Sequence, residues 1–207
     1  MTALPVSLNW NRSEVVKRSL DITVAGLALV ALSPLLALIA VFIKLDSPGP
    51  ALFRQQRPGR DMRLFTVLKF RTMRLGSDSL RPQDFASLGY GPDQKQRADP
   101  RITRVGRLLR RFSLDELPQF INVLKGDMSL VGPRPLLGWE LPASDLMARA
   151  GVLPGITGLW QVSGRSDLSF TEMLDLDLEY VRRRSLLLDL KIILKTLPAM
   201  LGTRGAY

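Results

Sequence analysis

The longest apolar segment of the chain limits its architecture more than any other feature. Residues Ile22 to Ile43 form a run of 22 positions without a charged side chain. As a straight helix the run would be roughly 33 Å long, which is enough to cross the hydrocarbon core of a bilayer. It is longer than a signal-peptide core of about 7–15 residues, and no A-x-A cleavage site follows it. We therefore expect the segment to stay in the mature protein and to enter a membrane.

A Ser-Pro pair interrupts this run at its midpoint. Pro34 lacks the N–H that would bond to the Val30 carbonyl, so it bends a helix. Ser33 can bond to the Leu29 carbonyl and help to satisfy the broken backbone. Each arm is then about 15–18 Å long, the depth of one leaflet. The pair therefore predicts a break between two short helical arms.

The charges on the two sides of the run favour the same face of the membrane. Positive side chains precede and follow it, at Arg12, Lys17, Arg18, Lys44, Arg54, Arg57, Arg60 and Arg63. Because positive residues favour the cytoplasm, we predict a re-entrant membrane segment in residues 1–47, with both termini cytoplasmic. Residues 48–207 would form a domain at the membrane surface. Lys17, Arg18 and Asp21 would hold lipid headgroups at the mouth, or be ordinary flanking charges. A bitopic scaffold with one terminus outside the cell is the alternative.

The overall composition restricts both partners and chemistry. A formal charge of +10 over 207 residues indicates an anionic partner, such as nucleic acid, an anionic membrane surface or a phosphorylated substrate. We expect no nucleic acid, because the sequence has no recognisable binding motif and no run of aromatics among its basic residues. The chain has no Cys and no His, which excludes thiol nucleophiles, imidazole bases and Cys/His zinc sites. Carboxylates, with Lys, Arg or a hard metal ion, must carry any chemistry.

One acidic pair lies in a segment that is otherwise rich in arginine. Asp115 and Glu116 follow Ser113 in the sequence Ser-Leu-Asp-Glu-Leu-Pro-Gln. Ser113 and Glu116 have the S-x-x-E spacing of a capping box, which predicts a helix start with both carboxylates in its first turn. Pro118 fits best nearer the first helical position and leaves the register open. The helix dipole there favours the ionised form that a nucleophile or a Mg²⁺ ligand requires. The alternative is plain helix capping.

Basic side chains end a predicted β-hairpin. Residues 51–56 and 64–70 have strand character and are separated by a turn that contains Pro58-Gly59. Lys69 and Arg71 place two cations near the end of the second strand. An edge strand protected by charge is the alternative.

Two further segments present arginine. Asp99-Pro100 predicts the start of a helix. Its arginines share one face, opposite Ile102, Val105, Leu108 and Leu109, and they are Arg101, Arg104, Arg107, Arg110 and Arg111. That basic face suits a membrane surface or a phosphate site, or is merely solvated. Arg134 stands between two prolines, in a stiff loop that can grip a diphosphate at low entropic cost.

The remaining segments complete a mainly α fold with a small β-hairpin, an α+β protein. Residues 75–99 predict a long loop, and the glycine-rich residues 151–165 around Trp160 predict a binding loop or membrane-interface packing. A helix is expected from Phe170 to Arg184. Residues 186–201 predict an amphipathic helix that is interfacial or part of the core.

In combination, these motifs resemble the bacterial sugar transferase family, in its small monotopic phosphoglycosyl transferases. The matching residues run through nearly the whole chain: Lys17-Arg18 with Asp21, the apolar run with Ser33-Pro34, Arg57-Pro58-Gly59, Lys69-Phe70-Arg71-Thr72-Met73, Arg110, Ser113 through Gln119, Asn122 through Ser129, Val131 through Pro135, and Pro154 through Val162. Single pieces are not specific, but their combination in this order is. The long N-terminal membrane domain of larger relatives is missing, so we expect a minimal catalytic unit.

The resemblance implies a reaction at the bacterial inner membrane. The family transfers a sugar phosphate from a nucleoside diphosphate sugar, usually a UDP-sugar, to a polyprenyl phosphate such as undecaprenyl phosphate, and releases UMP. The reaction begins a surface glycan (exopolysaccharide, capsule or O-antigen) at the cytoplasmic face, among the membrane phospholipids. The identity of the sugar and the oligomeric state stay open, a homodimer being one option.

The resemblance also implies roles for the candidate residues. Asp115 would attack the β-phosphorus and form an aspartyl-phosphosugar, and Glu116 would hold Mg²⁺ against the diphosphate. Four basic residues would bind substrate phosphates or the nucleotide, namely Lys69, Arg71, Arg110 and Arg134. The resemblance therefore favours catalysis over plain capping for the acidic pair.

Overall fold

The computed structural model describes residues 12–76, 99, 101–138, 143–164 and 167–201. The loop predicted at 75–99 lies almost wholly outside the described residues. Over the described part the chain is mainly helical, as predicted. In chain order the elements are α1 (Arg12–Asp46), β1 (Leu52–Pro58), η1 (Arg60–Met62), β2 (Leu64–Phe70), α3 (Arg104–Arg111), η3 (Leu114–Glu116), α4 (Gln119–Lys125), β3 (Ser129–Val131), α5 (Ala143–Arg149), β4 (Gly155–Thr157), α6 (Leu159–Ser163), α7 (Phe170–Arg183) and α8 (Leu186–Leu201).

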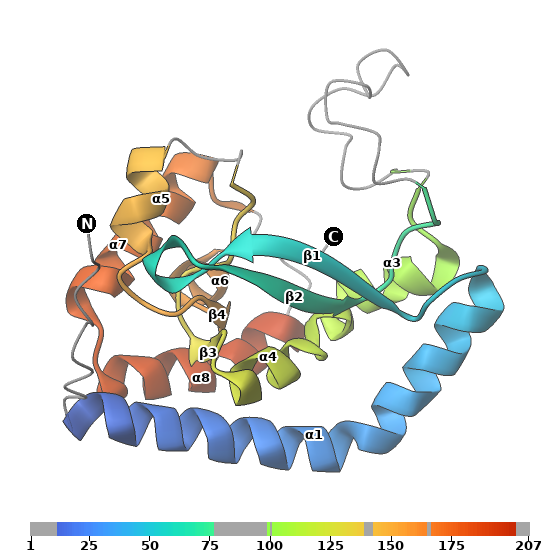
Figure 1. Cartoon of the computed structure of the whole chain (residues 1–207), viewed down its shortest axis with the longest axis horizontal. Helices are drawn as coiled ribbons and strands as arrows, with labels where there is room; N and C mark the ends of the chain where they lie inside the picture. Colours follow the sequence, from blue (N-terminus) through green and yellow to red (C-terminus); the bar gives the residue numbers. More distant parts are fainter. Residues whose placement is uncertain (1–11, 77–98, 100, 139–142, 165–166, 202–207) are drawn as a thin grey trace, which may run out of the picture.

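The apolar run forms most of one long helix, α1, that bends without breaking. α1 contains Pro34, and Figure 1 shows two arms at an angle, with the rest of the protein on the concave side. The Ser33 hydroxyl donates to the Val30 carbonyl at 2.8 Å. That carbonyl is the one that loses its N–H partner at Pro34, so the hydroxyl replaces the missing donor. The predicted bond to Leu29 was therefore wrong by one residue.

Both arms of α1 pack against the same body. On the first arm, Ala25 lies in a buried cluster with Val123 of α4. On the second, Ile39 and Ile43 pack with Phe70 of β2 in another cluster. The outward side is exposed, since only 11% of the most apolar 18-residue window is buried. By length and composition α1 is the one helix among the described residues that is able to cross a bilayer.

The charged residues at the start of α1 bind the protein itself. Lys17 Nζ lies 2.6 Å from Asp189 of α8. Arg18 donates to the carbonyls of Val123 and Leu124 on α4, at 2.6 and 3.0 Å. Asp21 is only 2% exposed, and its carboxylate accepts a hydrogen bond from the Leu130 N–H of β3 at 3.0 Å. These side chains fasten α1 to three other elements, and the headgroup role that we predicted for them stays a prediction.

The predicted β-hairpin is confirmed. β1 and β2 pair antiparallel, with Leu52 opposite Phe70 and Pro58 opposite Leu64. The buried side chain of Asn122 on α4 extends the sheet: its Oδ1 accepts the Leu68 N–H at 3.0 Å, and its Nδ2 donates to a β2 carbonyl at 2.7 Å. One amide thereby satisfies the open edge of β2, where an unpaired backbone would be costly.

A short parallel pair of strands, β3 and β4, was not predicted. Ser129 pairs with Gly155, and Val131 with Thr157. The chains pass so closely that a Cβ on Gly155 would lie 2.1 Å from the Gly132 nitrogen, so the glycine permits the contact. Three-residue strands are too short for a hydrophobic period to reveal them.

The helix boundaries were predicted unevenly. α3 begins at Arg104, because Thr103 caps it by accepting the Gly106 N–H at 2.9 Å. The predicted start at Asp99-Pro100 was therefore wrong, and Asp99 instead pairs with Arg101 at 2.7 Å. Leu108, which we placed on the apolar face, is mostly exposed. The helices predicted near 170–184 and 186–201 are confirmed as α7 and α8.

Candidate active site

The acidic pair lies in a single 3-10 turn, η3, between α3 and α4. Ser113 adopts a left-handed conformation with φ of 54° and makes no side-chain capping bond, so the predicted capping box was wrong. α4 begins only after Pro118, whose φ of −60° already suits a helix. Leu114 packs against the buried cluster that Ile39 and Ile43 of α1 form with Phe70 of β2 and Leu109 of α3. The carboxylate turn therefore packs on the buried cluster that joins α1 to β2 and α3.

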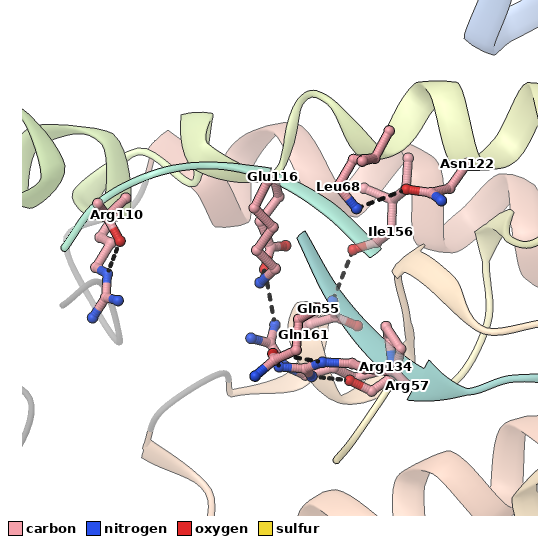
Figure 2. A network of polar contacts seen from close by, with 12 residues as sticks. Gln55, Arg57, Leu68, Arg110, Glu116, Asn122, Arg134, Ile156 and Gln161 are labelled. Atoms are coloured by element: carbon pink, nitrogen blue, oxygen red, sulfur yellow. Dashed lines mark hydrogen bonds and ion pairs between the residues drawn. The ribbon is translucent and has the colours of Figure 1, made fainter. Parts of the chain in front are cut away.

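Glu116 is held by two cations that are distant in the sequence. Lys69 Nζ donates to Glu116 Oε1 at 2.6 Å, and Arg134 Nη1 reaches the same oxygen at 3.3 Å. Figure 2 shows Glu116 pointing toward Arg134. Burial acts to raise the pKa of Glu116, but these cations outweigh it and lower the pKa to about 2. Glu116 is therefore ionised at any physiological pH.

Asp115 is in a different state. Its half-buried carboxylate makes no hydrogen bond or ion pair with any residue that the structure describes. Burial and the neighbouring charge of Glu116 raise the pKa of Asp115, while Lys69, Arg110 and Arg134 oppose the shift. Cations therefore surround a carboxylate that none of them binds directly. Such an oxygen is available for bond formation.

Two of the predicted phosphate-binding residues flank the pair from other directions. Burial lowers the pKa of Lys69 from its ordinary value, against the raising effect of Glu116. Arg110 donates its Nε–H to Thr72 at 2.9 Å and lies to one side of Glu116 in Figure 2. Its charge acts on Asp115. The structure thus brings Lys69, Arg110 and Arg134 around the acidic turn.

Arg71 is not part of this group. Its guanidinium, 5% exposed, donates to the carbonyls of Ser47 (2.7 Å) and Pro48, just after the end of α1. The prediction grouped it with Lys69 because the two are close in sequence. Alternate residues, such as 69 and 71, lie on the same face of a strand only while the strand continues. Because β2 ends at Phe70, Arg71 does not share the face of Lys69.

A small pocket adjoins the cation-bound carboxylate. The space within it, including the part that is open to solvent, is about 190 Å³. Its lining residues are Arg57, Lys69, Glu116, Gln119, Arg134, Pro135, Gly155, Ile156 and Gln161. Gln161 donates to the Ile156 carbonyl at 2.9 Å, and the Arg134 guanidinium lies 5.8 Å from the centre of the Trp160 ring. The glycine-rich segment around Trp160 therefore contributes to the walls of this site.

Comparison with known proteins places this site in a family. A model of the bacterial sugar transferase family matches residues 12–203. The chain belongs to the bacterial sugar transferase family. The family character and the names of the relatives establish it as an enzyme of the phosphoglycosyl transferase type.

Three relatives illustrate the match. The exopolysaccharide production protein ExoY of Sinorhizobium fredii is 43% identical, over 92% of this chain and 88% of the relative. The UDP-glucose:undecaprenyl-phosphate glucose-1-phosphate transferase of Caulobacter vibrioides is 46% identical, over 92% of this chain and 72% of the relative. The undecaprenyl-phosphate galactose phosphotransferase of Salmonella typhimurium is 42% identical, over 94% of this chain and 42% of that longer protein.

Several residues around this site have no role that the sequence predicted. The sequence placed Arg57 only among the charges after the apolar run and within a motif, yet it lines the pocket and its charge acts on Glu116. Arg149 and Asp177 form a buried ion pair at 2.5 Å beside the Arg134 loop. Arg149 ends α5, a helix of seven residues, which is too short to give a recognisable amphipathic period.

The donors for a metal ion are few. Among the described residues there is no cluster of three or more Asp, Glu, His or Cys side chains that could hold one. Both contacts to Glu116 reach Oε1, and Asp115 is the adjacent carboxylate. A protein usually binds Mg²⁺ through one or two carboxylates, and substrate phosphates complete the octahedral coordination. The pair therefore fits Mg²⁺ bound together with a diphosphate.

Proposed function

We propose that this enzyme transfers a sugar 1-phosphate from a UDP-sugar to undecaprenyl phosphate, releasing UMP, as the first membrane step of surface glycan synthesis. The proposal depends on the Asp115 carboxylate, to which none of the described residues bonds, and on its neighbour Glu116, which Lys69 and Arg134 hold in its ionised form. The relatives named for undecaprenyl phosphate, glucose 1-phosphate and exopolysaccharide production support the substrates and the pathway.

The reaction proceeds in two displacements at one phosphorus. An Asp115 oxygen attacks the β-phosphorus of the UDP-sugar, the bond to the bridging oxygen breaks, and UMP leaves with the electron pair. The product is an aspartyl-phosphosugar. A phosphate oxygen of undecaprenyl phosphate then attacks the same phosphorus and displaces Asp115, which regenerates the carboxylate. No net proton transfer is required, which agrees with a chain that lacks His.

Charge neutralisation is the main catalytic contribution of the other residues. Phosphoryl transfer depends on positioning and on electrostatic stabilisation of the equatorial oxygens. Lys69, Arg110 and Arg134 surround the reacting carboxylate and would bind those oxygens. Glu116, with Asp115 beside it, would hold Mg²⁺, whose chemical contribution when bound is to neutralise the diphosphate and its leaving group.

The membrane arrangement in this proposal is monotopic and re-entrant. Both arms of α1 pack on one body that carries the polar site, so a helix crossing the bilayer would draw part of that body into hydrocarbon. The outward face of α1 is apolar, with Leu27 67% exposed, and α8 exposes Leu194 at 74%. We infer that the apolar run within residues 1–47, residues 22–43, dips into the cytoplasmic leaflet of the inner membrane and returns. Residues 48–207 then stay at its surface, with both termini cytoplasmic.

The direct test is UMP release from purified enzyme in detergent or nanodiscs with undecaprenyl phosphate. We expect release with at least one member of a panel of UDP-glucose, UDP-galactose and their acetamido analogues. Without the lipid acceptor, a phosphosugar adduct should appear by mass spectrometry on the peptide that contains Asp115. Absence of UMP release with every donor would contradict the proposed function. Steep, salt-dependent binding of random DNA would instead favour a nucleic-acid role.

Replacing Glu116 with Gln should lower turnover on the order of 10²- to 10³-fold and move the acid limb of kcat/KM to lower pH. The charge of Glu116 raises the pKa of Asp115, so a neutral amide lets Asp115 ionise at lower pH. The measurement is UMP release against pH at saturating Mg²⁺, with the exposed Glu179→Gln as control. An unshifted acid limb would contradict this coupling, and wild-type activity with unchanged Mg²⁺ dependence would remove the metal role.

A further inference from the structure

The loop that presents Arg134 is held through its carbonyl groups. Arg134 lies between two prolines, neither of which has an N–H, so the loop has few donors of its own. Three successive carbonyls instead accept hydrogen bonds from three separate elements. The bonds are Gly155 N to Pro133 O (2.9 Å), Arg149 Nη2 to Arg134 O (2.7 Å) and Arg57 Nη1 to Pro135 O.

The central donor belongs to the buried ion pair. Arg149 of α5 is 6% exposed and Asp177 of α7 is 1% exposed. Arg149 Nη2 contacts both the Asp177 carboxylate, at 2.5 Å, and the Arg134 carbonyl. Burial raises the pKa of Asp177 to about 6, against the opposing charge of Arg149. The pair is therefore ionised at neutral pH. A buried pair adds little stability compared with apolar side chains of the same shape, so stability does not by itself account for it.

We propose that Arg149 and Asp177 are positioning residues for Arg134. They fix the backbone of Arg134, and this places its guanidinium 3.3 Å from Glu116 and over the Trp160 ring. Arg149 itself is not among the residues that line the pocket beside Glu116. The inference rests on the proposed function for the phosphate-binding role of Arg134, but the placement of its side chain is independent of that role.

The pair is best removed as a unit, by Arg149→Met with Asp177→Leu. Both replacements are apolar and similar in length and branching, so no buried charge is left unpaired and the fold should persist. The first readout is Trp160 fluorescence in a Trp10→Phe, Trp139→Phe background. We expect the emission of the double variant to shift to that of Arg134→Met in the same background, because the guanidinium no longer lies over the ring.

The second readout is kinetic. We expect kcat/KM for the UDP-sugar to fall on the order of 10²-fold, the effect of misplacing a catalytic group by about 1 Å. Arg149→Lys keeps the positive charge and three N–H donors, but its nitrogen lies one atom nearer the backbone than Arg149 Nη2 and lacks the planar fork. It should therefore recover only part of both readouts. The control removes the exposed ion pair on α7, the helix of Asp177, with Glu179→Gln and Arg183→Gln. It should change neither the Trp160 emission nor kcat/KM.

The two readouts separate the two proposals. Unchanged Trp160 emission in a stable double variant overturns the positioning role, whatever the activity. If the double variant does not fold, Arg149→Lys decides: parental emission together with parental kcat/KM also overturns it. Failure of the parent enzyme to release UMP contradicts the proposed function, while the emission still reports where Arg134 lies.

Discussion

Replacing Asp115 with Asn should abolish UMP release, by at least about 10³-fold, while the protein stays folded and bound to membranes. An amide of equal size cannot form the aspartyl-phosphosugar. Stability should be unchanged or slightly higher, because burial and Glu116 raise the pKa of Asp115. A carboxyl whose pKa is raised by folding costs stability above its unfolded pKa, and the neutral amide removes that cost.

The matched control is Asp61→Asn, which removes an exposed carboxylate at a left-handed position that Asn tolerates. It should retain parental turnover. The measurements are UMP release, thermal unfolding and mass spectrometry of the adduct on the Asp115 peptide. Turnover near the parental rate in Asp115→Asn would remove Asp115 as the nucleophile.

Local features of the fold were predictable from the sequence because nearby residues determine them. The β-hairpin follows from the alternation around Pro58-Gly59, and α4 ends at Gly126, where φ is 90°. Local signals also misled where another side chain competed. Thr103 caps α3 in place of Asp99, and Glu116 binds Lys69 in place of closing a capping box with Ser113.

The candidate site required long-range information. Lys69 and Arg134 are 47 and 18 residues from Glu116 in the sequence. No hydrophobic periodicity predicts that residues so far apart contact one another. Only the resemblance to a family brought them together in the sequence analysis. It did not indicate Arg149 and Asp177, which lie behind Arg134 and reach the site through its backbone. A residue that acts through a carbonyl has no signature in side-chain pattern alone.

Replacing Ser33-Pro34 with Ala-Leu should straighten α1 and make part of the population span the membrane. The change restores the N–H donor to the Val30 carbonyl and removes the Ser33 bond that now compensates for it. A straight run of 22 apolar residues is long enough to cross. A straight α1 is not able to follow both sides of the body on which its arms now pack. The contacts of Lys17, Arg18 and Asp21 oppose the change, so we expect a mixed population.

A single cysteine at Thr2 measures this outcome, since the chain has no other thiol. In the parent the probe should resist membrane-impermeant thiol reagents added outside the cell; in the double variant a measurable fraction should react. Ser33→Ala alone keeps Pro34 and the bend, so it should remain unlabelled. Asp61→Cys, placed in the catalytic domain, should be protected in every background and verifies that the cells are intact. External labelling of the parent at residue 2 would show a spanning helix, because an N-terminus outside the cell is what the bitopic alternative requires.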